Sequence, residues 1–367
     1  MWLYFAITIY IIGTGLLFGR SKLKQIKIFY LVLTFGLFTI LAMFRSSTVG
    51  NDTSEYIRLF GNIASNGDLS NYYWRYERGY LYLNKILAFF STNPQVIIIV
   101  SSLIIMTGFA RFIYKYSDNL WLSVYLFFTL GYFGSSMNTI RLHIAIVIIL
   151  FSYDYLRSNN LLKFVLTVII ASLFHRTAII FLAAWLIVKL KFNIKTVSIA
   201  IIGTIGIDIL FPYILQLAFR IFPTYQYYLG STYLDGNTRL ASVISFLVSI
   251  CMLVFGFMLR RRMKTEVYSL AEDSEIIIND GEKMSMLLLI GIALTVISFN
   301  FNLIERAGEF FSVFSIIYLP NSLKNISNKK IRLNLSFLIV LLFFIYSTSI
   351  LVLRPDWNVI YPYFFFS

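Results

Sequence analysis

Apolar runs of about 20 residues recur from one end of this chain to the other, and this feature limits its possible folds most strongly. A bilayer core about 30 Å thick takes roughly 20 helical residues to cross. The residue alternation of a membrane β-barrel is absent, so the runs indicate helices. With 59% hydrophobic residues and a mean hydropathy of +0.78, the sequence predicts an all-α, polytopic integral membrane protein.

The runs predict about twelve transmembrane helices in a single transmembrane domain, residues 1–367. Their expected bounds are 2–19, 28–44, 95–114, 120–137, 139–156, 161–174, 177–189, 196–214, 239–259, 284–301, 306–322 and 334–353. The weakly apolar stretch 79–91 is interpreted as a re-entrant or interfacial helix. The two short runs 161–174 and 177–189 flank His175, which suggests a broken pair around that residue.

Basic residues gather at the ends of these runs and give the expected topology. Under this count they all fall on one side, which the positive-inside rule makes cytoplasmic: Arg20, Lys22, Lys24, Lys27, Arg111, Lys115, Arg157, Lys163, Lys189, Lys191, Lys195, Arg260, Arg261, Arg262, Lys264, Lys324, Lys329, Lys330 and Arg332. Both termini and the loop 45–94, which is expected to carry short helices, then face outward, while 260–283 is a charged cytoplasmic loop containing an acidic linker. The net charge of +14 is explained without a nucleic-acid partner.

Several kinds of chemistry are excluded by what the sequence lacks. One cysteine, Cys251, rules out disulfides within the chain and metal sites built on cysteine pairs. No P-loop, GxGxxG or HExxH motif is present. We therefore expect no cofactor, no metal and no nucleotide-driven mechanism.

Polar residues emerge from the second run into the outer loop. Arg45 is followed by Asp52, Glu55 and Tyr56, and later by Glu77. Arginine binds phosphate oxygens bidentately and keeps its charge, which suits an anionic substrate. The alternative for Asp52 and Glu55 is a capping pair at the start of a short helix.

Two further groups of polar residues lie at the outer ends of later runs. Asn138 and Arg141 are three residues apart, so one helix face is expected to present both to an anion. His143, two residues on, is interpreted as structural. His175 beside Arg176 is suited to act as a general base, with a packing histidine as the alternative.

The last two groups come from the C-terminal third. Glu305, Arg306 and Glu309 open the eleventh run, where the carboxylates either bind substrate or only stabilise a helix start. The tail carries Tyr361 in an aromatic, proline-containing segment, which either stacks on sugars or anchors at the membrane interface.

At these residues the sequence resembles the EpsG-like group of bacterial exopolysaccharide and capsule polymerases, which belong with the broader Wzy type that also makes O-antigen. The shared landmarks are Val49-Gly50-Asn51-Asp52-Thr53 with Tyr56, Glu77 with Gly79-Tyr80, Asn138 with Arg141 and Ala145, Ala171 with His175 and Thr177, Arg306, and Tyr361-Pro362-Tyr363. Two positions differ: Leu142 stands where Gln is expected, and Thr177 stands where Ser is common.

The resemblance implies a metal-independent glycosyltransferase of a bacterial cytoplasmic membrane. It would join undecaprenyl-pyrophosphate-linked oligosaccharide repeat units on the outer face, alongside a flippase and a chain-length regulator. His175, Asp52 and Arg141 would be catalytic, and the substrate-binding residues would be Arg45, Glu55, Tyr56, Glu77, Asn138, Arg176, Glu305, Arg306 and Tyr361. The alternatives are a lipid-phosphosugar-dependent glycosyltransferase, a flippase of lipid-linked oligosaccharide, and a membrane acyltransferase.

Overall fold

The computed structural model describes residues 2–221, 226, 234, 240–266, 272–354, 357 and 359–366, with side chains except those of 218 and 262–279. Regular structure in this part of the chain is helical, apart from an isolated antiparallel bridge between Arg45 and Phe365. The all-α prediction is therefore confirmed. The helices form two compact units, residues 1–179 with 326–367, and residues 180–325.

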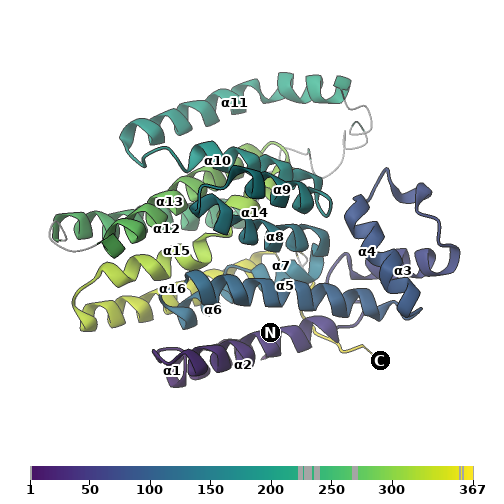
Figure 1. Cartoon of the computed structure of the whole chain (residues 1–367), viewed down its shortest axis with the longest axis horizontal. Helices are drawn as coiled ribbons and strands as arrows, with labels where there is room; N and C mark the ends of the chain where they lie inside the picture. Colours follow the sequence, from purple (N-terminus) through teal and green to yellow (C-terminus); the bar gives the residue numbers. More distant parts are fainter. Residues whose placement is uncertain are drawn as a thin grey trace. The chain divides into compact units, whose positions relative to one another are not determined.

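The first unit contains most of the helices in Figure 1. Its α-helices are α1 (Trp2–Leu17), α2 (Lys24–Met43), α3 (Thr53–Asn66), α4 (Arg78–Phe90), α5 (Gln95–Tyr116), α6 (Leu120–Thr129), α7 (Tyr132–Asn138), α8 (Ile140–Arg157), α9 (Leu161–Ser172) and α16 (Lys329–Leu353), with a 3₁₀ helix η1 (Ser70–Tyr72). Helix α5 packs against α2 and α8, and α8 packs against α9.

Aromatic rings fill the centre of this unit. Phe38 of α2 lies 4.7 Å from the ring of Phe133, and Phe109 of α5 lies 4.7 Å from that of Phe127. Helix α8 is apolar around most of its circumference and buried, as expected for a helix surrounded by others. A Cβ on Gly108 would lie 2.1 Å from Val147, so the glycine sets how closely α5 and α8 approach.

The second unit contains α10 (Ala184–Ile187), α11 (Ile194–Ile221), α12 (Leu240–Glu266), α13 (Glu272–Ser298), α14 (Glu305–Ser312) and α15 (Ser315–Ser322), with 3₁₀ helices η4 (Asn302–Ile304) and η5 (Leu323–Asn325). The 3₁₀ helix η2 (Arg176–Ala183) contains the boundary between the units. Inside the unit, the guanidinium of Arg260 donates to the Tyr318 hydroxyl at 2.9 Å and to Ser285. This network joins α12, α13 and α15.

Six helices of the described residues are long and apolar enough to cross a membrane. They are α2, α5, α11, Leu240–Arg261 within α12, Asp280–Ser298 within α13, and α16. A seventh span is possible if α6 and α7, bent by 50°, form one. The bend falls at Gly131, whose φ of 86° is a left-handed conformation that favours glycine. A membrane protein with several spans is thus confirmed.

Three sequence expectations for individual segments need correction. The run 120–137 is divided at Gly131, as described. The run 306–322 is divided into α14 and α15, because the backbone at 313–317 makes hydrogen bonds three residues apart, from Ile316 N to Val313 O and from Ile317 N to Phe314 O. The acidic linker in 265–283 is largely helical, since α12 ends at Glu266 and α13 begins at Glu272, and residues 267–271 lie outside the described residues.

Helix α4 occupies the stretch interpreted as re-entrant or interfacial. Its 13 residues extend about 20 Å at 1.5 Å each, too short to span a bilayer core. Tyr82, Ile86, Phe89 and Phe90 are exposed and recur at helical spacing along one face. The segment is therefore a short amphipathic helix, and its membrane placement stays a prediction.

Candidate substrate-binding and catalytic site

Arg45 lies just beyond α2 and is 1% exposed. Its Nε donates to Thr53 Oγ1 at 3.3 Å, and its Nη2 donates to the carbonyl of Met137 at 3.0 Å. Its Nη1 donates to the carbonyl of Ala42 and to Ser102 Oγ at 3.4 Å. One guanidinium therefore ties together the end of α2, the start of α3, α5 and α7.

The turn before α3 has a backbone that needs glycine. Gly50 has φ 88°, and a Cβ there would lie 2.9 Å from Thr53 Oγ1 and 3.1 Å from the carbonyl of Met137, two of the acceptors of Arg45. The backbone N–H of Gly50 donates to the carbonyl of Val359 at 3.0 Å. The C-terminal tail thus lies against this turn.

The tail holds Tyr361 near the first helices of the same unit. The ring of Tyr361 meets that of Tyr4 edge-on at 6.2 Å, and the hydroxyl of Tyr363 donates to the carbonyl of Leu41. Burial raises the pKa of Tyr363 to about 12. Both tyrosines are therefore packed against helices, while Phe364 and Phe366 are exposed.

Asn138 connects α7 to both the turn and the tail. Its Oδ1 accepts the backbone N–H of Asp52 at 3.0 Å, and its Nδ2 donates to the carbonyl of Trp357 at 3.4 Å. The expected shared helix face of Asn138 and Arg141 is wrong, because Thr139, with ψ 63°, interrupts the helix between them. The two side chains serve different contacts.

Asp52 and Glu55 do not form a side-chain capping pair. Asp52 is the N-cap residue of α3, but its side chain makes no capping hydrogen bond. Glu55 turns to Arg58 Nη2 at 2.6 Å, to Arg75 Nη1 at 3.0 Å and to the Tyr76 hydroxyl at 2.8 Å. Partial burial raises the pKa of Glu55, but the hydrogen bonds of Tyr76 and Arg58 and the charge of Arg75 outweigh it and lower the pKa below its ordinary value.

Glu77 and Arg141 form the most buried ion pair among the described residues, with side chains 9% and 19% exposed. Glu77 Oε2 accepts from Arg141 Nη1, and the guanidinium also lies 4.9 Å from the ring centroid of Tyr76 and interacts with Tyr56. Tyr56 is buried, with its ring edge-on to that of Tyr80 at 5.6 Å. Arg141 Nε is buried and has no hydrogen-bond partner among the described residues.

The second oxygen of Glu77 reaches the break after α9. Glu77 Oε1 accepts the backbone N–H of Arg176 at 3.3 Å, and Arg176 Nη2 donates to the carbonyl of Tyr73 at 3.0 Å. Gly79 N–H donates to the carbonyl of Leu173 at 2.8 Å, and a Cβ on Gly79 would lie 2.7 Å from that oxygen. The start of α4 therefore lies directly against the break that contains His175.

The two histidines have different surroundings. His175 lies in the turn between α9 and η2, where its Nδ1 is 2.7 Å from Thr177 Oγ1. Thr177 thus supplies the hydroxyl that a serine would offer. His143 is fully buried, with Nδ1 3.1 Å from Thr139 Oγ1 and its ring 6.4 Å from that of Phe109, which fits a packing role.

The remaining residues selected from the sequence belong to the second unit. Glu305 and Arg306 form the first turn of α14, where an acidic residue is favoured by the helix dipole. Oε2 of Glu309, one turn further, is buried and accepts no hydrogen bond from the described residues. No group of three or more His, Cys, Asp or Glu suited to hold a metal ion occurs in the described part of the chain.

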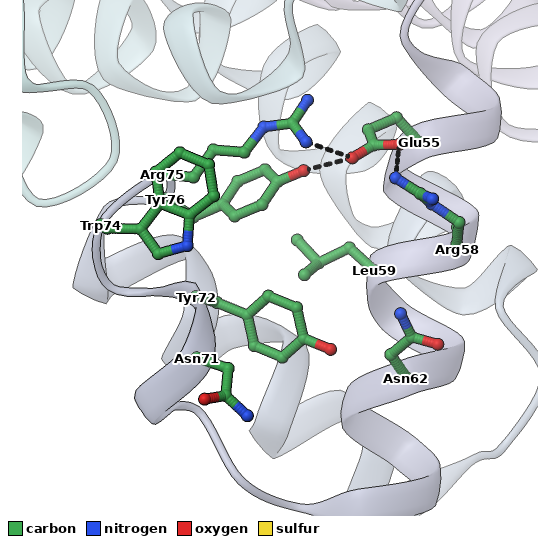
Figure 2. Close-up of a pocket in the computed structure, with 9 residues that line it drawn as sticks. All are labelled: Glu55, Arg58, Leu59, Asn62, Asn71, Tyr72, Trp74, Arg75 and Tyr76. Atoms are coloured by element: carbon green, nitrogen blue, oxygen red, sulfur yellow. Dashed lines mark hydrogen bonds and ion pairs between the residues drawn. The ribbon is translucent and has the colours of Figure 1, made fainter. Parts of the chain in front are cut away.

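Contacts within the first unit thus bring together most of the residues selected from the sequence. The carboxylate of Glu77 contacts the side chain of Arg141 and the backbone of Arg176, the residue after His175, and Asn138 contacts Asp52 and the tail. The sequence reasoning missed Tyr72 and Trp74, which line a hollow together with residues of α3 (Figure 2). Their signal was the density of aromatic residues between Tyr72 and Tyr80.

A comparison with known families matches a model described as EpsG family over residues 27–365, nearly the whole chain. No curated protein and no solved structure matches the chain.

Proposed function

The chain belongs to the EpsG family, and on that premise we propose that it is a polysaccharide polymerase. It would join undecaprenyl-pyrophosphate-linked oligosaccharide repeat units by glycosyl transfer on the outer face of a bacterial cytoplasmic membrane. The proposal includes the twelve-span topology, in which 45–94, His175 and the tail share the outer side.

One observation supports this function most directly. The carboxylate of Glu77 joins the side chain of Arg141 to the backbone of Arg176, next to His175. The same carboxylate thus contacts an arginine suited to a phosphate, from α8, and the residue that follows a histidine suited to proton transfer, in the break after α9. Neither group would need a metal or nucleotide to act on a lipid-linked pyrophosphate.

Arg141 would stabilise the leaving group. As the glycosidic C–O bond to the pyrophosphate breaks, negative charge grows on the phosphate oxygens, and a preorganised guanidinium lowers the barrier. Its side chain is 19% exposed, so part of the guanidinium is accessible to this second anion. Glu77 orients the arginine before substrate binds.

His175 would accept the proton of the acceptor hydroxyl as its oxygen attacks the anomeric carbon. This requires the tautomer in which Nδ1–H donates to Thr177 Oγ1, because Nε2 then carries the lone pair. The products are the new glycosidic bond, undecaprenyl pyrophosphate and protonated His175. Asp52, half-buried at the start of α3, is the second candidate base.

The other selected residues would orient the carbohydrate and its carrier. We assign Asn138 and Tyr361 to holding the turn and tail beside the site, and Glu55, Tyr56 and Arg176 to the sugar side of it. Arg45 fits a positioning role, because four protein acceptors already surround its guanidinium. Glu305 and Arg306 stay proposed substrate contacts from the second unit.

The test is reconstitution of the purified full chain in nanodiscs with undecaprenyl-pyrophosphate-linked repeat units. A ladder of longer lipid-linked chains is expected without nucleotide sugar, ATP or added divalent metal. Requirement for a nucleotide sugar or a phosphosugar lipid would overturn the polymerase proposal in favour of another glycosyltransferase. An added acyl mass without elongation would make the protein an acyltransferase.

A deletion strain separates polymerase from flippase. Loss of a polymerase leaves single repeat units on the outer face, whereas loss of a flippase leaves them on the cytoplasmic face. Accumulation inside would therefore contradict the proposal.

A further inference from the structure

A hollow of about 130 Å³ lies between α3 and the segment 71–76 (Figure 2). One wall is α3, with Glu55, Leu59 and Asn62, and the other carries Asn71 and Trp74. Leu59 is the one aliphatic side chain among the nine that line it. Its volume is well below the roughly 300–1,000 Å³ of pockets that enclose drug-sized ligands, so it fits a small group.

The lining combines aromatic rings with amides. Trp74 is 68% exposed, so most of its ring is not covered by protein. Aromatic faces pack against the apolar C–H face of a sugar ring, while an amide donates and accepts and thus matches hydroxyl groups, which do both. Asn62 and Asn71 supply such amides from opposite walls, and Figure 2 shows the Tyr72 ring between them.

An exposed tryptophan is also typical of a membrane interface. The chain has an apolar face of that kind on α4, at Ile86, Phe89 and Phe90. The hollow differs, because charged and amide groups surround Trp74 there. Its polar lining favours a carbohydrate over lipid.

Charged residues keep the hollow in shape. Both oxygens of Glu55 are engaged, Oε1 by Arg75 and Tyr76 and Oε2 by Arg58. These contacts fix the segment 75–76 against α3. The sugar-binding surface would therefore exist before ligand arrives, which reduces the ordering cost of binding.

Tyr76 connects the hollow to the ion pair described above. Its hydroxyl donates to Glu55 at 2.8 Å, and its ring lies 4.9 Å from the guanidinium carbon of Arg141. A sugar ring bound in the hollow would thus be separated from Arg141 by the side chain of Tyr76. A carbohydrate chain held there has a neighbouring sugar within reach of the reacting groups.

We propose that this hollow is a subsite for one sugar ring of the carbohydrate chain, removed from the reacting end. The assignment deepens the polymerase proposal and rests on it for the identity of the chain. The sugar-binding property itself rests on the hollow alone.

The test uses saturation-transfer NMR on the full-length protein in nanodiscs, with glucose, galactose, N-acetylglucosamine and glucuronate as separate probes. At least one sugar is expected to bind, and Trp74→Ala and Asn62→Ala should weaken that binding about tenfold. Trp2→Ala is the matched control, since Trp2 is 77% exposed on α1 and outside the hollow. Inorganic phosphate should not displace the sugar.

Absence of sugar binding in the wild type, displacement by phosphate, or binding unchanged in Trp74→Ala would overturn the subsite. A lower Tm of Trp74→Ala in nanodiscs without loss of sugar binding would make the residue an interfacial anchor. Different results would refute the polymerase proposal and the subsite proposal. Sugar binding without a ladder refutes only the polymerase, whereas a ladder whose chain length is unchanged in Trp74→Ala refutes only the subsite.

Discussion

Arg45 and Arg141 lie in the same unit, and both carry the residue type expected to bind phosphate, but their surroundings differ. The guanidinium of Arg45 is fully buried and donates to two hydroxyls and two carbonyls from four elements. Arg141 is part-exposed, pairs with one carboxylate, lies over one ring and keeps a buried Nε without a partner in the described structure. Exposure and the number of protein acceptors therefore separate an arginine that holds the fold from one that a ligand can reach.

The largest effect is expected for Arg45→Ala. Removing the guanidinium leaves the carbonyls of Ala42 and Met137 buried without that donor, and each buried acceptor left unsatisfied costs about 1–3 kcal/mol. The variant should lose folded protein, measured as monodisperse material by size-exclusion chromatography and as Tm in detergent. Arg111→Ala is the control, because Arg111 pairs with Asp154 while 38% exposed. A stable Arg45→Ala protein that makes no product would instead place Arg45 on the substrate.

Arg141→Lys should behave in the opposite way. Lysine can keep an ion pair with Glu77, so the fold and Tm should be retained. It offers a point charge in place of a planar fork, and the loss of one preorganised donor typically lowers the rate by about 10²–10³. The ladder assay measures this directly. Wild-type rates would mean that Arg141 acts only structurally, as Arg45 does.

Two glycine substitutions test the same difference between the structural and the ligand-binding region without removing a charge. Gly50→Ala places a methyl group in a left-handed conformation beside two acceptors of Arg45, at a cost of about 1–2 kcal/mol for the backbone alone. Gly79→Ala forces α4 away from Leu173 and the His175 turn, and misplacement by about 1 Å can cost up to 100-fold in rate.

We therefore expect Gly50→Ala to lower Tm more than specific activity, and Gly79→Ala to lower specific activity more than Tm. Gly61→Ala is the control, since nothing lies within 4 Å of its Cβ position and alanine in a helix stabilises by about 0.4–1 kcal/mol. The reverse order for Gly50 and Gly79 would refute the division of roles.

The sequence could predict the helices because long apolar runs have few structural solutions. It could not place the break inside the run 120–137, which depends on the single backbone conformation of Gly131. The residue type alone identifies Arg45 and Arg141 equally as anion binders. Whether protein acceptors already surround a guanidinium depends on the tertiary structure, which residue type does not reveal. Tyr76 was missed for the same reason: its importance comes from touching both Glu55 and Arg141, which lie 86 residues apart in sequence (141 − 55).

The smallest effect is expected for Glu55→Gln, and it tests how the Tyr76 contact depends on charge. Because the folded-state pKa of Glu55 lies below its ordinary 4.5, the carboxylate stabilises the α3 contact fully above that pH and loses its effect as pH falls through the folded-state pKa. Because the cluster is largely solvated, the charge of Glu55 stabilises this contact by about 0.5 kcal/mol. That free energy corresponds to roughly a twofold change in the amide exchange rates of residues 75 and 76.

Hydrogen–deuterium exchange should therefore show faster exchange in Glu55→Gln than in wild type at pH 7, and equal rates once the carboxylate is protonated. The amides at 50 and 53 provide the internal control, because the acceptors of Arg45 are hydroxyls and carbonyls that do not titrate in this range. A ratio at residues 75 and 76 that does not change with pH would show that the Glu55 charge does not hold Tyr76. A matching change at residues 50 and 53 would show that the surroundings of Arg45 respond to the Glu55 charge together with those of Arg141. The distinction between a structural and a ligand-binding arginine would then be refuted.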